Sequence, residues 1–249
     1  MNLANFRELG GYQSSNGKKV KNKRLLRSGE VYQLNEASVE ALNDHELTKI
    51  IDLRGEKEIS SRPDDKINDV SYHWIDIMKE VHDNGSMEDL MDMADIKAVD
   101  RHMMGIYENL ILNEGAQEGY QKYFKELLST ETGGVLFHCF AGKDRTGIAA
   151  VLTLELLDVP KMTIYEDYLA TNRQRKKPNE LFLAEAASRG FSDVQLAGAK
   201  VALEVKKEYL DYSYDLINQH FGGVQNYTKE VLKVNSQDVQ LLQHLYLEK

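Results

Sequence analysis

Cysteine is almost absent from this chain of 249 residues, which holds a single thiol at Cys139. One cysteine excludes an intramolecular disulfide framework and any zinc site built from several thiolates. It also argues against thiol chemistry that needs a resolving cysteine, such as arsenate reduction. The one thiol must therefore be structural, or act without a second cysteine.

Long apolar runs are also absent. The first thirty residues contain no stretch of the length that a secretory signal needs. The longest apolar region, Gly147–Val159, is too short to span a bilayer and is interrupted by Glu155 and Asp158. We therefore expect a cytoplasmic protein without stable membrane insertion. The formal net charge of −9 argues against general nucleic-acid binding.

Only three prolines occur, and no repeat, low-complexity tract or flexible linker divides the chain, so we expect one domain over residues 1–249. Compact β-branched or alternating runs predict strands, and apolar periodicity with capping residues predicts helices. The expected strands cover 25–28, 49–54, 70–77 and 134–138. Helices are expected at 35–43, 87–113, 115–129 and 146–157, and throughout the chain after Pro160. This order favours an α/β fold with a helical C-terminal third.

The helical pattern over 87–113 is rich in methionine and acidic residues. Methionine at helical spacing is typical of core packing, but it also suits a surface that packs and unpacks. We interpret residues 78–114 as a helical insertion that either forms a lid over a pocket or is fixed in place.

The segment His138 to Gly147, HCFAGKDRTG, surrounds the single cysteine. It lies between a predicted buried strand and a predicted helix, so its backbone N–H groups would converge on an anion at the helix N-terminus. A thiol there experiences the helix dipole and the charge of Arg145, which should bring its pKa into a range of roughly 3.5–7.5. A buried structural cysteine is the alternative interpretation.

This arrangement indicates phosphoryl transfer. Cys139 would attack phosphorus, Arg145 would hold two phosphoryl oxygens, and water would then release phosphate, with no metal or cofactor required. Gly142 would let the backbone close around the anion, and Thr146 would donate its hydroxyl to the thiolate. His138 would fix the loop by hydrogen bonding to backbone groups.

The loop resembles the signature of the protein tyrosine phosphatase superfamily, His-Cys-x5-Arg-Ser/Thr. More narrowly, it is similar to that of a bacterial branch with the loop HCxAGKDRTG. This branch is related to dual-specificity and phosphoinositide phosphatases. Residues 5–11, 27–29, 51–54, 167–172 and 221–227 are similar to other segments of that branch. The resemblance implies a mostly parallel central sheet flanked by helices. It implies phosphotyrosine hydrolysis, with phosphorylated protein or phosphoinositide as the substrate. A lipid phosphatase and a catalytically idle phosphate-binding module are the alternatives.

The leaving phenolate requires a proton donor. The resemblance favours Asp144 in the loop, although the neighbouring charges of Lys143 and Arg145 should disfavour its protonated form. Asp76 is the alternative, because Trp74-Ile75-Asp76 superficially resembles a Trp-Pro-Asp acid loop. The alternating pattern around it instead predicts a strand, with Trp74 packed on one face.

The remaining candidates surround the loop. Lys143 is either a solvated charge or a pocket charge for a second phosphate, whereas the basic run 173–177 is interpreted as a solvated loop. Asp52 and Arg54 should support the loop rather than contact substrate. The resemblance alone suggests Asn5, Arg7 and Asn172 as neighbours of the site. We predict substrate-binding roles for Phe140, Ala141, Gly142, Lys143, Thr146 and Gly147.

Overall fold

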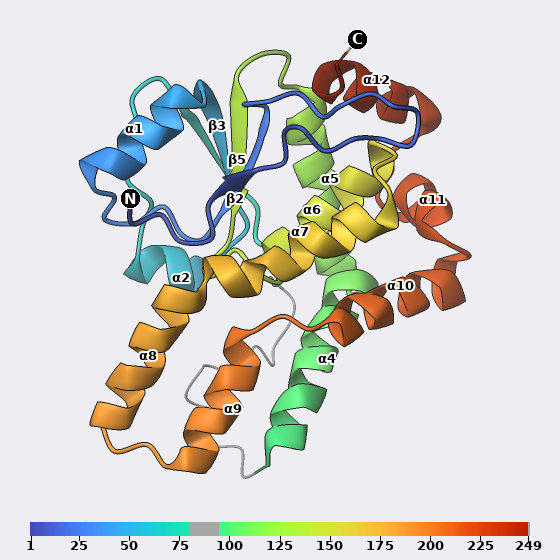
Figure 1. The fold of residues 1–249 in the computed structure, drawn as a ribbon. Coiled ribbons are helices and arrows are strands. Elements are labelled where there is room, and N and C mark those ends of the chain that lie inside the picture. The colour runs from blue at the N-terminus through green and yellow to red at the C-terminus, as the bar shows by residue number, and fades with distance from the viewer. Residues whose placement is uncertain (80–94, 249) are drawn as a thin grey trace.

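The protein is described by a computed structural model that covers residues 1–79 and 95–248 (Figure 1). Its five-stranded sheet has the order β1-β2-β5-β3-β4. The strands β2, β5, β3 and β4 each run parallel to their neighbours in this order, and β1 pairs antiparallel with β2 at the edge. This confirms the predicted α/β class. The strands are β1 (Arg7–Glu8), β2 (Leu25–Ser28), β3 (Leu47–Asp52), β4 (Ser71–Trp74) and β5 (Gly134–His138).

Helices cover both faces of the sheet and form the whole C-terminal third (Figure 1). The N-terminal and central helices are α1 (Glu36–Asp44), α2 (Glu56–Ser61), α4 (Ile96–Leu112), α5 (Glu114–Leu128) and α6 (Arg145–Leu156). The later ones are α7 (Lys161–Gln174), α8 (Lys176–Ser188), α9 (Asp193–Leu203), α10 (Lys207–Phe221), α11 (Val224–Asn226), the π-helix η1 (Tyr227–Val231) and α12 (Ser236–Tyr246). None of the described helices is both long and apolar enough to cross a bilayer.

Alternate residues of the central strands face opposite sides of the sheet and pack in two separate hydrophobic cores. In β5, Val135 and Phe137 face a large core shared with α4, α5, α6 and α10, whereas Leu136 faces a smaller core beneath α1. Ile51 and Ile50 of β3 divide in the same way. Burial on both faces explains why these strands read as continuous apolar runs.

Three local predictions were wrong. The strand expected over 70–77 ends at Trp74, which is 49% exposed on the edge strand rather than packed; its indole N–H donates to the Arg54 carbonyl. The pattern Thr163-Ile164-Tyr165-Glu166 predicts a capping box at a helix start, but α7 already begins at Lys161. Proline favours the first position of a helix, which predicts a helix start at Pro178, but Pro178 is the third residue of α8.

The insertion expected over 78–114 is described only in part, since Met87, Met91 and Met93 lie outside the described residues. From Ile96 onward, α4 is anchored rather than free: Met103, Tyr107 and Leu110 are buried in the main core. The part of this segment from Ile96 to Leu112 is therefore a helix packed in the main core.

The carboxyl ends of β5, β3 and β4 meet at one edge of the sheet. The register pairs Asp52 with His138 on one side and with Trp74 on the other. Chain segments that leave these strands therefore meet at that edge, as ligand-binding segments of parallel sheets generally do.

Candidate active site

The loop from His138 to Arg145 connects β5 to α6 at this edge. Cys139 follows directly after the strand and is 2% exposed, and Arg145 opens the helix. Gly142 takes a left-handed φ of +66°, and an added Cβ there would lie 2.2 Å from the Ser28 carbonyl oxygen. Only glycine fits that position, because the chain needs both positive φ and close backbone approach.

Donors from distant segments hold the loop carbonyls. Asn5 donates its Nδ2 to the Gly142 oxygen at 2.7 Å, and Arg27 donates its Nη2 to the same oxygen at 3.0 Å. Arg175 donates its Nη1 to the Ala141 oxygen, also at 3.0 Å. With their carbonyls bonded to these outer partners, the peptide units of the loop turn their N–H groups the other way.

Those N–H groups are available for a ligand. No described residue accepts a hydrogen bond from the backbone N–H groups of residues 140–144. The Phe140 carbonyl accepts from the Glu30 amide at 3.0 Å, which extends the same outward pattern. Consecutive unpaired amides at a helix N-terminus form an anion-binding site.

The environment of Cys139 favours the thiolate. Burial by itself would raise the pKa of the thiol. The positive charge of Arg145 and hydrogen bonds from the hydroxyl and backbone N–H of Thr146 outweigh this effect, so the pKa lies below its ordinary value. A lowered pKa makes the sulfur nucleophilic at neutral pH.

Arg145 is held by Glu58 of α2, a residue that the sequence analysis did not identify. Its Nη1 and Nη2 donate to the two carboxylate oxygens of Glu58, at 2.5 and 2.8 Å. Glu58 Oε2 also accepts the Gly55 amide at 2.8 Å, which fixes the carboxylate. Burial opposes ionisation of Glu58, but Arg145 keeps its pKa below the usual value. Glu58 therefore orients the guanidinium.

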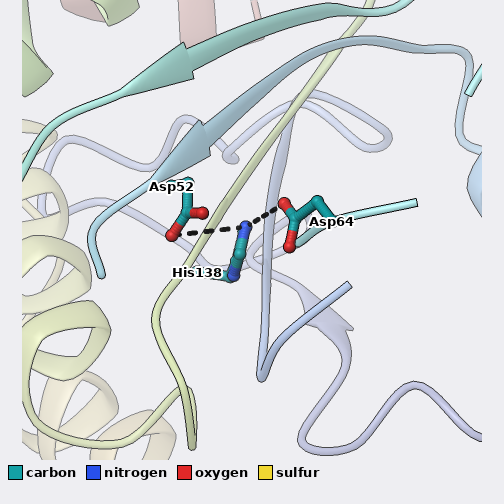
Figure 2. A group of neighbouring side chains, drawn as sticks. All are labelled: Asp52, Asp64 and His138. Atoms are coloured by element: carbon teal, nitrogen blue, oxygen red, sulfur yellow. Dashed lines mark hydrogen bonds and ion pairs between the residues drawn. The ribbon is translucent and has the colours of Figure 1, made fainter. Parts of the chain in front are cut away.

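Behind the loop lies a buried cluster of Asp52, Asp64 and His138 (Figure 2). His138 Nε2 is 2.8 Å from Asp64 and 3.9 Å from Asp52. Burial lowers the pKa of His138, but the two carboxylates raise it by more. The ligand types could hold a metal ion; however, Arg54 Nη2 already pairs with both carboxylates, at 2.7 and 2.6 Å. The charge balance therefore favours an ion-pair cluster over a metal centre.

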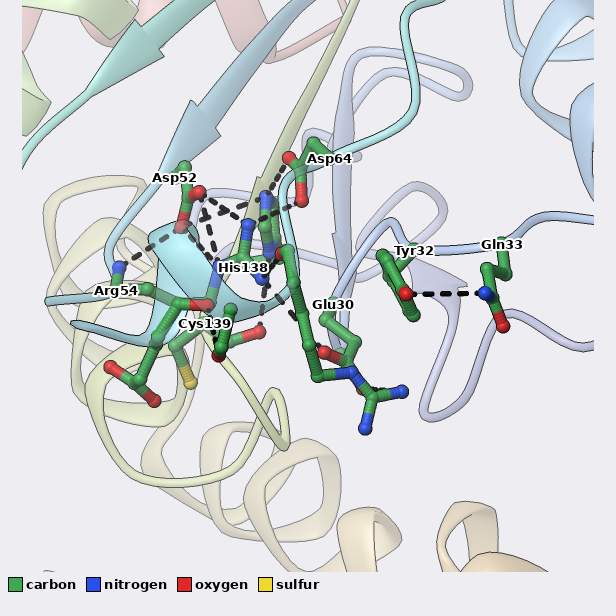
Figure 3. Close-up of polar contacts among 12 residues, drawn as sticks. Glu30, Tyr32, Gln33, Asp52, Arg54, Asp64, His138 and Cys139 are labelled. Carbon is green, nitrogen blue, oxygen red and sulfur yellow. Dashed lines mark hydrogen bonds and ion pairs between the residues drawn. The ribbon is translucent and has the colours of Figure 1, made fainter. Parts of the chain in front are cut away.

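This cluster supports the loop from beneath. His138 Nδ1 lies 3.2 Å from the Cys139 carbonyl oxygen, while the sulfur points away from the cluster (Figure 3). Arg54 is fully buried and extends toward Glu30, at 3.8 Å. Asp52 and Arg54 thus belong to the ion-pair cluster around His138. Asp64 belongs to the same cluster, although its sequence context did not indicate this role.

The structure brings the two candidate proton donors to the same edge of the sheet in different settings. Asp144 accepts a hydrogen bond from the buried Tyr107 hydroxyl at 2.7 Å and pairs with Lys143 at 3.2 Å. Lys143 is 5% exposed and donates to the Ala202 carbonyl, so its interpretation as a solvated charge was wrong. Asp76 is half-buried, and burial raises its pKa while Arg145 partly offsets the rise.

The other predicted residues fall into three groups. Phe140 is 42% exposed at the loop rim, beneath the Arg62 guanidinium, whereas Ala141 faces Asn5 and Arg175 with its carbonyl. Gly147 packs in α6 with Tyr168, where a Cβ would lie 3.4 Å from the ring. Asn172 bonds both the amide and the carbonyl of Val205, two residues before α10 begins.

Arg7 and Arg27 share Asp167 beneath the loop. Arg7 Nε pairs with its Oδ1 at 2.7 Å, and Arg27 Nη1 with its Oδ2 at 2.6 Å. Arg27 and Asp167 are essentially buried. This triad connects the N-terminal segment to α7 and positions the guanidinium that holds the Gly142 carbonyl.

Sequence comparisons relate the chain to known proteins. A profile of the tyrosine phosphatase family matches residues 1–248. A candidate tyrosine-protein phosphatase from Cupriavidus necator is 32% identical over 250 residues, covering 98% of this chain and 86% of that protein. The triple specificity protein phosphatase PtpB of Mycobacterium tuberculosis is 26% identical over 236 residues, covering 83% of this chain and 85% of its own length. The solved structure of P. aeruginosa TpbA covers 74% of this chain and 90% of its own, with 18% identity and a TM-score of 0.31.

A strand, a cysteine loop and a helix that opens on arginine define a phosphoryl-transfer enzyme. The match over almost the whole length places the chain more narrowly: it belongs to the tyrosine phosphatase family. It is therefore a phosphoric monoester hydrolase of the protein-tyrosine phosphatase class.

Proposed function

We propose that the enzyme hydrolyses phosphotyrosine through a phosphocysteine intermediate. The Cys139 thiolate attacks phosphorus, the S–P bond forms, and the bond from phosphorus to the phenolic oxygen breaks. The loop N–H groups and Arg145 stabilise the charge on the three equatorial oxygens. Water then attacks phosphorus, the S–P bond breaks, and inorganic phosphate leaves.

The observation that carries this proposal is the setting of Cys139. A thiol of lowered pKa lies in a ring of unpaired amides, beside an arginine that a carboxylate holds in place. These features supply a nucleophile, an anion site and charge stabilisation at one position. The residues that we assign to substrate binding are Phe140, Ala141, Gly142 and Lys143 of the ring, with Thr146 and Gly147 in the first turn of α6.

Asp144 is the proposed proton donor for the leaving phenolate and the base for the attacking water. It lies in the loop, and its carboxylate accepts a hydrogen bond from the Tyr107 hydroxyl, which in turn accepts one from the Tyr168 hydroxyl at 2.6 Å. Asp76 is the competing donor, because burial raises its pKa and keeps it protonated to higher pH. The two assignments predict that a different variant, Asp144→Asn or Asp76→Asn, loses activity mainly on substrates with poor leaving groups.

We also propose a substrate range wider than phosphotyrosine. The similarity to PtpB, whose name states triple specificity, supports activity on phosphoserine, phosphothreonine or phosphoinositides. A phosphoinositide phosphatase is the alternative main activity. Residues 1–249 would form one phosphatase domain, which the extent of the family match supports.

The test is phosphate release from a phosphotyrosine peptide, a phosphoserine peptide and soluble phosphoinositides, in the presence of a chelator. Cys139→Ser should lower release by roughly 10⁴-fold or more while leaving the protein folded. A phosphocysteine trapped by rapid acid quenching should appear on the peptide containing Cys139. Release that survives Cys139→Ser would contradict the mechanism.

A further inference from the structure

Arg175 lies where α7 ends and α8 begins, next to the catalytic loop. It was expected in a solvated basic run, but it is 9% exposed. Its Nη1 donates to the Ala141 carbonyl at 3.0 Å. By contrast, Arg173, two residues earlier, is exposed. Arg175 is thus directed inward from the helix junction.

Among the described residues, no carboxylate balances the charge of Arg175. The other arginines near the site that the structure describes, Arg27, Arg54 and Arg145, each pair with a carboxylate within 2.7 Å. No described carboxylate forms an ion pair with Arg175, and its Nε is buried without an acceptor. Buried charges are ordinarily paired, because leaving one unpaired costs several kcal/mol. The site therefore has one cation more than its protein partners compensate.

One terminal nitrogen of this guanidinium is open to a ligand. Nη1 donates to Ala141, and Nε is buried without an acceptor, so Nη2 is the nitrogen that a ligand can reach. Nη2 has no acceptor among the described residues and is not one of the buried atoms. A charged N–H donor of this kind forms a charge-assisted hydrogen bond with a carboxylate oxygen.

Its position relative to the loop distinguishes this group from Arg145. The scissile phosphate occupies the ring of amides, whereas Arg175 bonds a carbonyl on the outside of that ring. An anion on Arg175 would therefore lie beside the scissile phosphate. Burial lowers the pKa of Arg175, and the negative charges of Cys139, Asp144 and Glu30 counteract this effect, which is consistent with a location close to the thiolate.

We propose that Arg175 is a specificity-determining residue that binds the carboxylate of an acidic residue adjacent to phosphotyrosine in a peptide substrate. This proposal rests on the function proposed above. A peptide is favoured over a lipid because the chain belongs to the tyrosine phosphatase family and the exposed Phe140 ring at the rim offers a contact for a peptide side chain.

The test compares pairs of phosphotyrosine peptides that differ only in Asp or Asn, with the changed residue directly before the phosphotyrosine in one pair and directly after it in the other. Wild-type enzyme should prefer the Asp peptide of one pair by about tenfold in kcat/KM. Arg175→Gln retains a donor for Ala141 but not the charge, and should bring that ratio to about one. Arg175→Lys should retain part of the preference, and the exposed neighbour provides the control Arg173→Gln, which should retain all of it.

Equal cleavage of both members in both pairs by wild-type enzyme would overturn this proposal and leave the phosphatase mechanism intact. The wild-type ratio needs no variant, so it remains decisive even if Arg175→Gln fails to fold. Absence of Cys139-dependent release from every peptide would instead remove the proposed function. If Arg175→Gln changes only the ratio between soluble phosphatidylinositol bisphosphate and monophosphate, the carboxylate assignment is wrong.

Discussion

Glu58 and Arg145 face one another as a two-pronged ion pair, with both terminal nitrogens of the guanidinium on one carboxylate. The pair joins α2 to the first residue of α6 across the mouth of the loop. A guanidinium held from behind keeps its orientation before substrate arrives, which lowers the entropy lost in the transition state.

Glu58→Gln should therefore weaken catalysis without unfolding the protein. We expect kcat/KM to fall about 10- to 100-fold, because Arg145 loses its anchor. Competitive inhibition by inorganic phosphate should weaken in parallel. Glu56→Gln, on the exposed face of the same helix, is the matched control. An unchanged phosphate inhibition constant for Glu58→Gln would contradict a positioning role.

Gly142→Ala should prevent the loop from closing. Alanine at this position would have to adopt the left-handed φ of +66°, and its Cβ would lie 2.2 Å from the Ser28 carbonyl oxygen. Gly190 has a similar φ of +87° but nothing within 4 Å, so Gly190→Ala measures the conformational cost alone, about 1 kcal/mol. Urea unfolding of both variants should show the larger loss for Gly142→Ala, together with loss of phosphatase activity. Equal losses would mean that the loop accommodates the methyl group.

The proton donor can be identified by varying the leaving group. Loss of a general acid slows cleavage of poor leaving groups most, because these need protonation. Asp144→Asn should therefore lower kcat by about 10²-fold or more on phenyl phosphate, and much less on p-nitrophenyl phosphate. Asp76→Asn is the direct comparison. The raised pKa of Asp76 predicts that activity falls at alkaline pH if Asp76 is the proton donor. The assignment moves to Asp76 if only Asp76→Asn slows poor leaving groups selectively and this variant also loses that alkaline fall in activity.

The pKa of Cys139 can be measured without interference, because no other thiol reacts. The rate of alkylation by iodoacetamide should reach half its maximum at a pH below the ordinary thiol value of about 8.5. Thr146→Val removes the hydroxyl that stabilises the thiolate and should raise this midpoint. Thr163→Val in α7 should leave it unchanged. A wild-type midpoint at or above 8.5 would show that burial outweighs the charge of Arg145.

Asp167 should make the fold sensitive to acid. Burial alone would raise its pKa, but Arg27 and Arg7 hold it below the ordinary value. Its contribution to stability is therefore fully present above about pH 3.9, the unfolded value, and is lost as the pH falls through the lower folded value. Asp167→Asn should cost about 3–5 kcal/mol at pH 7, and this difference should shrink below pH 4. The exposed neighbour variant Glu166→Gln should show neither effect in urea titrations.

Local patterns predicted the framework of the site. The apolar run over 134–138 gave the strand β5 at its observed bounds, and the motif that follows placed the loop and α6. Asp52 and Arg54 could be assigned to the loop's support because parallel strands end at a common edge. Each of these inferences uses residues that lie close together in the chain.

Residues whose roles depend on tertiary approach were not predictable in the same way. Glu58 belongs to a short, charged helix with no buried residue, so its sequence resembles any solvated surface helix. Arg175 was hidden in a basic run for the same reason. Trp74 illustrates the converse, because alternation predicted a packed face whereas β4 is an edge strand with open neighbours.

The donors that hold the loop carbonyls make formation of the loop depend on segments that lie far apart in the sequence, from Asn5 to Arg175. Asn5 and Gly142 are separated by 137 positions in sequence, Arg27 and Gly142 by 115, and Arg175 contributes from a point 34 positions beyond Ala141. A nascent or partly folded chain lacks these contacts, so it should carry an ordinary thiol and no anion site. Enzymatic activity would then require the chain to fold as far as Arg175, and a chain truncated before this residue should lack phosphatase activity.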